Sequence, residues 1–209
     1  MKALTHNHTS NPYGRSDLQT IAHWIPNGSR VLDLGCGNGD FLKTLKQEKQ
    51  VTGYGIELDA EKVARCIDNG VNVIQTNLDQ GLADFDSDSF DYVVLSLTLQ
   101  AVHRPQLLLQ EMLRVGQHGI VTFPNFAHWR NRLQIALSGQ MPVSKQLPHK
   151  WYNTPNIHLC TIKDFKVLCE ELDIKVDTFL ALNSSNANSA PISILPNLLG
   201  EIALTKFSK

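Results

Sequence analysis

A glycine-rich turn after an apolar run is the feature that most constrains how this chain folds. Residues 31–40 read VLDLGCGNGD, so a buried strand gives way to glycines before an amphipathic segment begins. Glycine lets the backbone turn sharply and lets a ligand lie against bare peptide. The helix that follows directs its unpaired N–H groups to the same place. The pattern therefore predicts a strand, a turn and a helix that bind a nucleotide-like cofactor.

The spacing of the glycines distinguishes between cofactors. Gly35, Gly37 and Gly39 form the pattern G-x-G-x-G, whereas the dinucleotide fingerprint is G-x-G-x-x-G. Asp40 stands where the dinucleotide pattern has its third glycine, and its negative charge disfavours a pyrophosphate. S-adenosylmethionine carries a sulfonium and an amino-acid head but no phosphate. It therefore fits this turn and the acid Asp33 beside it.

A further acid follows at the distance that a nucleotide-binding unit needs. Residues 51–56 form a predicted strand that ends at Glu57, which lies 20 residues beyond Gly37. In a strand–helix–strand unit an acid at this position reaches the ribose hydroxyls, both in NAD binders and in S-adenosylmethionine binders. Without the glycine turn, Glu57 would be interpreted as a solvated acid at a strand end. Combined with the glycine turn, its position favours ribose binding.

The composition limits the classes of protein that fit. The chain has 209 residues, of which 42% are hydrophobic, and this suits one globular domain with a substantial core. A formal charge of −1 provides no basic field for nucleic acid, and no apolar run reaches the length of a membrane span. Four cysteines without paired spacing favour a reduced, cytoplasmic protein. No metal site is predicted, because His149, His158 and Cys160 match no zinc pattern.

Alternating strands and helices predict a doubly wound α/β sheet. The predicted strands are 30–34, 51–56, 71–75, 90–96, 120–123, 174–180 and 201–207. The predicted helices are 16–24, a segment that ends near 48, 59–69, 105–115 and 161–173, with Asp59 and Thr161 as caps. Residues 1–14 are predicted to be a flexible arm, residues 15–209 the domain, and residues 183–190 a polar loop within it.

A long insertion at residues 124–160 interrupts this alternation. It contains two tryptophans, four prolines and three histidines. Connections at the carboxyl edge of such a sheet cover the ligand crevice. The aromatic side chains either pack on their own domain or contact a partner. Because Trp, Tyr and Arg dominate interface energetics, we expect a partner contact from Trp129, Arg130, Trp151 and Tyr152.

The ordered motifs resemble a known family. The glycine turn, Glu57 and the run FDYVV at 90–94 are similar to class I S-adenosylmethionine-dependent methyltransferases over about residues 29–123. Nearly the whole chain after residue 15 resembles the methionine-biosynthesis protein MetW family, through FPNFAHWR (123–130), WYNTPNIHLCT (151–161), EMLRV (111–115) and SLTLQAV (96–102). The resemblance implies a Rossmann-like, seven-stranded methyltransferase sheet of order 3-2-1-4-5-7-6 with strand 7 antiparallel.

The resemblance also implies a binding site for S-adenosylmethionine or S-adenosylhomocysteine. The residues that it places around this cofactor are Asp33, Gly35, Cys36, Gly37, Gly39, Glu57, Leu58, Asn77, Leu78 and Ser96. Glu57 would hold both ribose hydroxyls, and Leu58 would lie beside the adenine. Asn77 stands where the family usually has an acid, and its side-chain oxygen still accepts a hydrogen bond from the adenine amino group. Leu78 offers a backbone N–H, and Asp79 is the alternative acid.

Three functions remain open for the chain. By resemblance, it partners and activates a homoserine O-acyltransferase in methionine biosynthesis. The second function is an active methyltransferase on an unidentified small acceptor, which needs only proximity because the sulfonium is already activated. The third, an NAD-dependent oxidoreductase, is disfavoured by Asp40. No catalytic residue is predicted, since Gln100 cannot act as a base near neutral pH and a histidine such as His103 more often caps or faces solvent.

Overall fold

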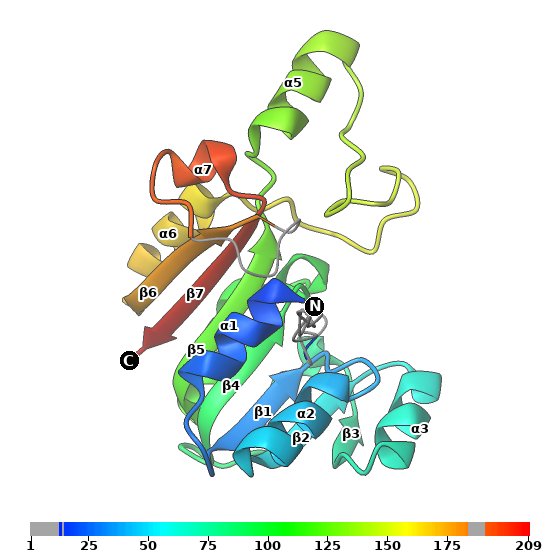
Figure 1. Ribbon diagram of the computed structural model, residues 1–209, viewed down its shortest axis with the longest axis vertical. Helices are drawn as coiled ribbons and strands as arrows, with labels where there is room; N and C mark the ends of the chain where they lie inside the picture. The colour runs from blue at the N-terminus through cyan, green and yellow to red at the C-terminus, as the bar shows by residue number, and fades with distance from the viewer. Residues whose placement is uncertain (1–12, 14, 184–190) are drawn as a thin grey trace, which may run out of the picture.

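The sheet at the centre of the molecule has seven strands in the order β3-β2-β1-β4-β5-β7-β6 (Figure 1). The computed structural model describes residue 13, residues 15–183 and residues 191–209. Pairs among β3, β2, β1, β4 and β5 are parallel, whereas β7 is antiparallel to β5 and β6. The predicted strand order is confirmed. Most of the predicted arm at 1–14 and of the predicted loop at 183–190 lies outside the described residues.

The bounds of most elements agree with the sequence prediction. The strands are β1 (Arg30–Leu34), β2 (Thr52–Glu57), β3 (Val73–Gln75), β4 (Phe90–Ser96), β5 (Gly116–Pro124), β6 (Lys175–Leu182) and β7 (Ile202–Ser208). The helices are α1 (Ser16–Trp24), α2 (Asp40–Lys49), α3 (Ala60–Asp68), η1 (Leu78–Gln80), η2 (Leu99–Ala101), α4 (Pro105–Val115), α5 (Trp129–Ser138), α6 (Ile162–Glu171) and α7 (Pro196–Leu199). None of them, within the described part of the chain, has the length and apolar content needed to cross a membrane.

Side-chain caps begin two of the helices where the sequence predicts them. The Asp59 carboxylate accepts the backbone N–H groups of Glu61 and Lys62 at the start of α3. Thr161 begins α6 in a capping box, in which its hydroxyl accepts the N–H of Asp164 and the Asp164 side chain accepts the N–H of Thr161. These caps satisfy backbone donors that the first turn of a helix leaves unpaired.

Helices cover both faces of the sheet. Val31, Val94 and Ile120 belong to one buried cluster together with side chains from α1 and α2. The alternate side chains, such as Leu32 and Val93, belong to a second cluster together with α4 and α6. A parallel strand covered on both faces is apolar throughout, which explains the continuous apolar run of β4. The two cores hold the sheet rigid and fix the position of its carboxyl edge.

Strand β5 is longer than the sequence predicts. It runs over Gly116–Pro124, whereas the apolar pattern indicated only residues 120–123. Gly116 pairs with Phe90 of β4. A Cβ atom at Gly119 would lie 2.3 Å from the ring of Phe207 in β7, so the close packing of that ring requires glycine. Glycine weakens a strand pattern, and this is why the prediction began too late.

The insertion at 124–160 contains a helix that the sequence analysis missed. Helix α5 projects away from the sheet (Figure 1), and Asn131 is the buried residue on it. The chain then returns toward the sheet as irregular structure. The backbone N–H groups of Ile157 and His158 donate to the carbonyl of Gln100 at 2.7 and 3.0 Å. The returning part of the insertion therefore contacts η2, which follows the carboxyl end of β4.

Candidate functional site

The turn between β1 and α2 has a backbone that glycine allows. Gly35, Gly37 and Gly39 have φ angles of 74°, 60° and 78°. Gly35 also has no room for a side chain, because a Cβ atom there would lie 2.8 Å from Oγ1 of Thr98. A Cβ atom at Gly37 would meet nothing within 4 Å, so this part of the turn presents bare backbone to open space. The turn therefore leaves room for a ligand against its peptide groups.

Glu57 ends β2 with its side chain directed at the glycine turn. One carboxylate oxygen accepts the backbone N–H of Gly37 at 2.9 Å. The other oxygen accepts the N–H groups of Leu58 and Asp59 at 2.9 and 3.0 Å. Glu57 is buried, whereas the Leu58 side chain is exposed. The structure thus brings together two features that lie 20 positions apart in the sequence.

Asp33 is the second acid of the site and is buried. Burial raises the pKa of its carboxyl group to about 7; the charge of Arg15 lowers this pKa and the charge of Glu57 raises it. Arg15 precedes α1, and its guanidinium donates to Asp17 and, at 2.7 Å, to Oγ of Ser96. Arg15 is therefore a cation beside the predicted crevice that the sequence analysis did not identify. No local pattern reveals that it lies against the end of β4.

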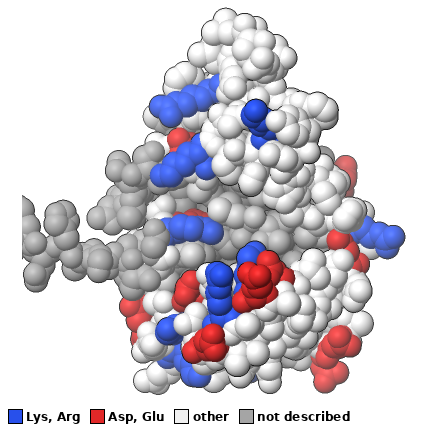
Figure 2. Space-filling model, turned by 90° about the vertical axis from the view of Figure 1, so that its right-hand side faces the viewer, with Lys and Arg blue, Asp and Glu red and all other residues white. Residues whose placement is uncertain are grey.

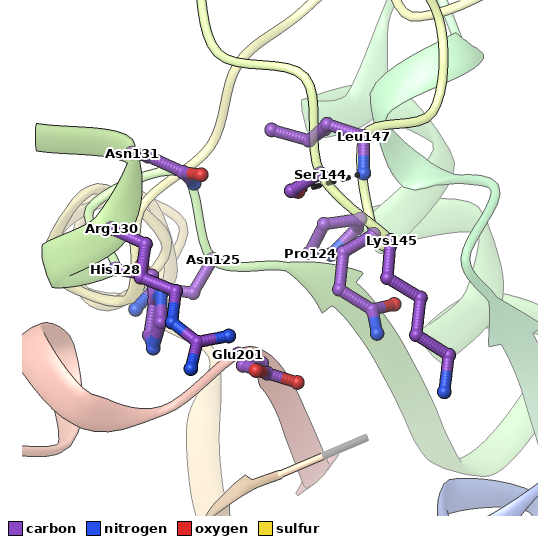
Figure 3. A pocket seen from close by; sticks show the side chains of 10 residues that line it. Pro124, Asn125, His128, Arg130, Asn131, Ser144, Lys145, Leu147 and Glu201 are labelled. Carbon is purple, nitrogen blue, oxygen red and sulfur yellow. Dashed lines mark hydrogen bonds between the residues drawn. The ribbon is translucent and has the colours of Figure 1, made fainter. Parts of the chain in front are cut away.

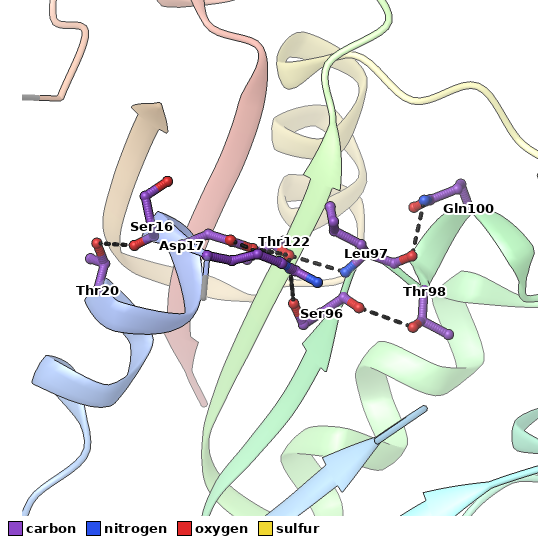
Figure 4. Close-up of polar contacts among 9 residues, drawn as sticks. Ser16, Asp17, Thr20, Ser96, Leu97, Thr98, Gln100 and Thr122 are labelled. Carbon is purple, nitrogen blue, oxygen red and sulfur yellow. Dashed lines mark hydrogen bonds and ion pairs between the residues drawn. The ribbon is translucent and has the colours of Figure 1, made fainter. Parts of the chain in front are cut away.

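A polar network holds the turn that follows β4 (Figure 4). Oγ of Ser96 lies 3.2 Å from Oγ1 of Thr122, which is fully buried in β5. The backbone N–H of Leu97 donates to the same Thr122 hydroxyl at 3.0 Å. Leu97 has a φ of 53°, a conformation that costs about 1–3 kcal/mol for a residue with a side chain. Thr122 thus supports a strained turn beside the site, and the sequence analysis missed this residue too.

Both candidate adenine contacts take part in hydrogen bonds within the protein. The side-chain oxygen of Asn77 accepts the backbone N–H of Asp79 at 3.0 Å and begins η1. Asp79 accepts the backbone N–H of His103 at 2.8 Å and pairs with its Nδ1 at 2.7 Å. Burial raises the pKa of Asp79, but the hydrogen bonds from His103 outweigh this effect and lower it overall. His103 engages both oxygens of Asp79, so each of the two adenine candidates already has a partner within the protein. Leu78 packs against the core.

Gln100 occupies the position after β4 where a catalytic base was considered. Its side chain is buried, and Nε2 donates to the carbonyl of Leu97 at 3.1 Å. Within the described part of the chain, Oε1 has no hydrogen-bond partner. A side-chain amide does not take up a proton near neutral pH. This position therefore supplies no general base.

Cys36 packs within the turn against a second cysteine. Its Sγ lies 3.7 Å from Sγ of Cys66 in α3, and the Cys66 thiol donates to the carbonyl of Gly37 at 3.1 Å. A Cβ atom at Gly55 would lie 2.4 Å from the Cys36 sulfur, so the thiol fills the space that this glycine leaves. Burial raises the pKa of both thiols. The geometry makes Cys36 a packing residue of the turn.

A separate hollow lies between the insertion and the end of the sheet (Figure 3). It is open to solvent. The residues that line it are Pro124, Asn125, His128, Arg130, Asn131, Ser144, Lys145, Gln146, Leu147 and Glu201. The Asn125 side chain donates to the carbonyls of Asn197 and Gly200 at 3.0 and 2.9 Å, which ties the start of the insertion to the segment before β7. Burial lowers the pKa of His128.

The aromatic residues predicted to contact a partner lie on the surface of the insertion. The exposed fractions of Trp151 and Tyr152 are 73% and 63%, and that of Trp129 is 41%. The rings of Trp151 and Tyr152 meet edge to face at 5.7 Å, and the Arg130 guanidinium lies 5.4 Å from the centre of the Trp129 ring. Such exposure favours contact with a partner over packing within the domain.

The strand order defines a class of protein, the S-adenosylmethionine-dependent methyltransferase fold. A methyltransferase of this kind from Mesorhizobium loti aligns with a TM-score of 0.69 and 18% identity, over 94% of this chain and 99% of that chain. A possible histamine N-methyltransferase from Thermotoga maritima aligns with a TM-score of 0.65 and 19% identity, over 93% of this chain and 87% of that chain. At these identities the likeness concerns the fold.

Within this class the chain belongs to the MetW family. The model of the family "Methionine biosynthesis protein MetW" matches residues 15–207. A bifunctional methionine biosynthesis protein MetXA/MetW from Rhodopirellula baltica is 36% identical over 202 residues, which cover 92% of this chain and 32% of that relative. A phosphatidylethanolamine N-methyltransferase from Cereibacter sphaeroides is 31% identical over 117 residues, 52% of this chain and 57% of that relative. The chain spans less than two thirds of the length of these curated relatives.

Proposed function

We propose that the glycine turn and the carboxyl ends of β1 and β2 bind S-adenosylmethionine or S-adenosylhomocysteine. The observation that carries this proposal is the bond from the Gly37 N–H to the Glu57 carboxylate, which puts an acid at the edge of an open glycine turn. The methionine part would lie on the turn beside Asp33, with the ribose hydroxyls at Glu57. The adenine would lie between Leu58 and Asn77. The bare backbone at Gly37 fits a ligand that approaches closely.

Arg15 and Ser96 extend this proposed site toward the end of β4. The Arg15 guanidinium lies 2.7 Å from the Ser96 hydroxyl and influences the ionisation of Asp33. Its charge suits the carboxylate of the amino-acid head, and the ionised form of Asp33 suits the ammonium and the sulfonium. When bound, the sulfonium supplies an activated methyl group.

An acid at the start of α2 argues against a dinucleotide. Asp40 begins α2 and lies in its first turn, where a pyrophosphate would receive the N–H groups of the helix. Calorimetry with S-adenosylmethionine, S-adenosylhomocysteine and NAD tests the choice. We expect the first two to bind. Binding of NAD alone would show that the cofactor assignment is wrong.

We also propose that the chain pairs with a homoserine O-acyltransferase and activates it. The support is the relative whose name joins MetXA and MetW, because the part similar to this chain is 32% of its length. Fusion keeps two units at high effective concentration, which is useful where they act together. S-adenosylmethionine derives from methionine, so its occupancy of the crevice would report the end product of the pathway to the acyltransferase.

Methyl transfer to a small acceptor is the second candidate function. The relatives and structural neighbours named as methyltransferases favour it. A thiolate or amine acceptor needs no general base, so the amide at Gln100 does not exclude this reaction. It would need only a methyl group and an acceptor held together in a dry crevice.

Co-expression of the full chain with the acyltransferase from the same source separates the two candidates. A tag on the acyltransferase allows co-purification to be measured, and the acyl-transfer rate is then compared with and without this chain. We expect a stable complex and a faster acyl transfer, without conversion of S-adenosylmethionine to S-adenosylhomocysteine. The methyltransferase would instead be supported if no complex forms, the acyl-transfer rate does not change, and S-adenosylmethionine is converted to S-adenosylhomocysteine.

A further inference from the structure

Helix α5 carries an apolar stripe without a partner in the described part of the chain. Trp129, Leu133 and Leu137 stand at positions i, i+4 and i+8, so they share one face of the helix. Their exposed fractions are 41%, 46% and 79%. Asn131, the buried residue of α5, is on the opposite face and donates to the carbonyl of Phe126 at 3.2 Å. The helix is therefore held to the domain by its polar face and presents its apolar face to solvent.

The α5 stripe is unusual because an apolar helix face is normally buried against other elements. A helix of this length is marginal on its own in water, and most of its stability comes from burying an apolar face. Large apolar surfaces that remain exposed mark sites of interaction. A helix that projects from the domain and turns its apolar side outward is thus suited to dock into a groove of another protein.

A second apolar feature lies in the same insertion. An open hollow lies between the segments that flank α5, with Phe126, Met141, Trp151 and Leu159 among the residues around it. Its walls come from both ends of the insertion. It offers a recess for a large apolar side chain within the same insertion, and anchors of this kind contribute most of the binding energy at interfaces.

The charged residues of the insertion are all basic. Residues 124–160 contain Arg130, Arg132, Lys145 and Lys150 but no Asp or Glu. All 20 Asp and Glu, and the other 15 of the 19 Lys and Arg, lie elsewhere in the chain. Figure 2 shows Lys and Arg on the upper part of the molecule, whereas most Asp and Glu gather below. A partner surface that complements the insertion would be apolar at its centre and acidic at its rim.

We propose that the α5 stripe, together with the hollow formed by the segments that flank α5, is the docking surface for the acyltransferase, which receives α5 in an apolar groove with an acidic rim. This inference rests on the proposed partnership with that enzyme. The occupant follows from the fused relative, since the match to it covers 92% of this chain. The insertion is 37 residues long, more than the unmatched share of the chain, so the match includes part of it. The MetXA part of that relative is thus joined to a unit that includes at least part of this insertion.

Charge substitutions in the stripe test the inference. The full chain with both Leu133→Asp and Leu137→Asp is compared with the wild type for capture by the tagged acyltransferase. The control is Ile67→Asp, because Ile67 is an apolar residue on α3 with an exposed fraction of 64%. We expect the double variant to bind at least tenfold more weakly and the control to bind like the wild type. Melting temperature and affinity for S-adenosylhomocysteine should stay unchanged in both.

A second variant examines the opposite end of the surface and its charge. Trp151→Ala combined with Arg130→Ala should also weaken capture while leaving the melting temperature unchanged. Raising the salt concentration from about 0.05 to 0.5 M should weaken the wild-type complex, because salt screens exposed charges. If either the stripe variant or the Trp151→Ala, Arg130→Ala variant unfolds, then the insertion belongs to the core, and this overturns the inference.

The remaining outcomes separate the surface from the partnership. Equal capture of the wild type and the stripe variant overturns the docking surface and leaves the partnership standing. Failure to capture the wild-type chain contradicts the proposed function itself. If light scattering finds the wild type dimeric and the stripe variant monomeric, with capture unchanged, then the stripe joins two copies of this chain and the inference is wrong.

Discussion

Replacing Glu57 with alanine should weaken cofactor binding by a predictable amount. In the structure its carboxylate accepts backbone N–H groups from Gly37, Leu58 and Asp59. In the complex we expect it also to accept the two ribose hydroxyls. A hydrogen bond to a charged group contributes about 1.5–3 kcal/mol. The ligand shares this carboxylate with the backbone donors, so the net loss is about 2 kcal/mol, which raises Kd about 30-fold.

Calorimetric titration of S-adenosylhomocysteine measures this change. Glu57→Gln keeps one acceptor oxygen and should lose about half as much, close to a fivefold rise in Kd. Glu61→Ala is the matched control, because Glu61 is exposed in the first turn of α3. Thermal unfolding of each variant confirms the fold, since alanine leaves three N–H groups without their acceptor. An unchanged Kd in folded Glu57→Ala would refute the ribose role.

Three further predictions concern the same crevice. Asn77→Asp should tighten adenine binding because an anionic acceptor makes the stronger bond; if only Asp79→Ala changes the affinity, Asp79 is the contact. Burial raises the pKa of Asp33 to about 7, and a cationic ligand favours the ionised form, so the affinity for S-adenosylmethionine should rise with pH up to about 7 and then level off. Asp33→Asn should weaken this pH dependence, and an identical profile contradicts the assignment. Gly35→Ala should lower the unfolding free energy by about 1–2 kcal/mol, through the positive φ and the contact with Thr98, and an unchanged denaturant midpoint would oppose this.

The sequence predicted the local elements well because their signals are local. The apolar run of β4 lies within the strand, and the caps Asp59 and Thr161 directly precede the helices that they begin. The strand order came from the family resemblance, since alternation does not decide which strands are neighbours. Helix α5 was missed because its apolar residues do not share one face: Ile135 stands on the side of Asn131, opposite the stripe, so the amphipathic pattern is weak.

The candidate site was predictable only for residues that belong to one continuous strand–helix–strand unit. The glycine turn and Glu57 belong to one strand–helix–strand unit, and their spacing is readable in the sequence. Arg15 reaches Ser96 across 81 positions, and Thr122 reaches Asp17 across 105. Contacts of this range depend on how α1 packs on the sheet. No spacing rule identifies such contacts, so Arg15 and Thr122 were found only in the structure.

The acyl-transfer rate of the purified acyltransferase, titrated with the full chain, tests the central claim most directly. The rate is measured at fixed enzyme concentration, with and without S-adenosylmethionine. We predict that the rate rises and saturates near one chain per acyltransferase subunit. We also predict that S-adenosylmethionine changes the concentration of chain needed for half of this rise. The stripe variant of α5 should need far more chain to reach the same rate. A rate that stays flat at every concentration of the chain would contradict the proposed function.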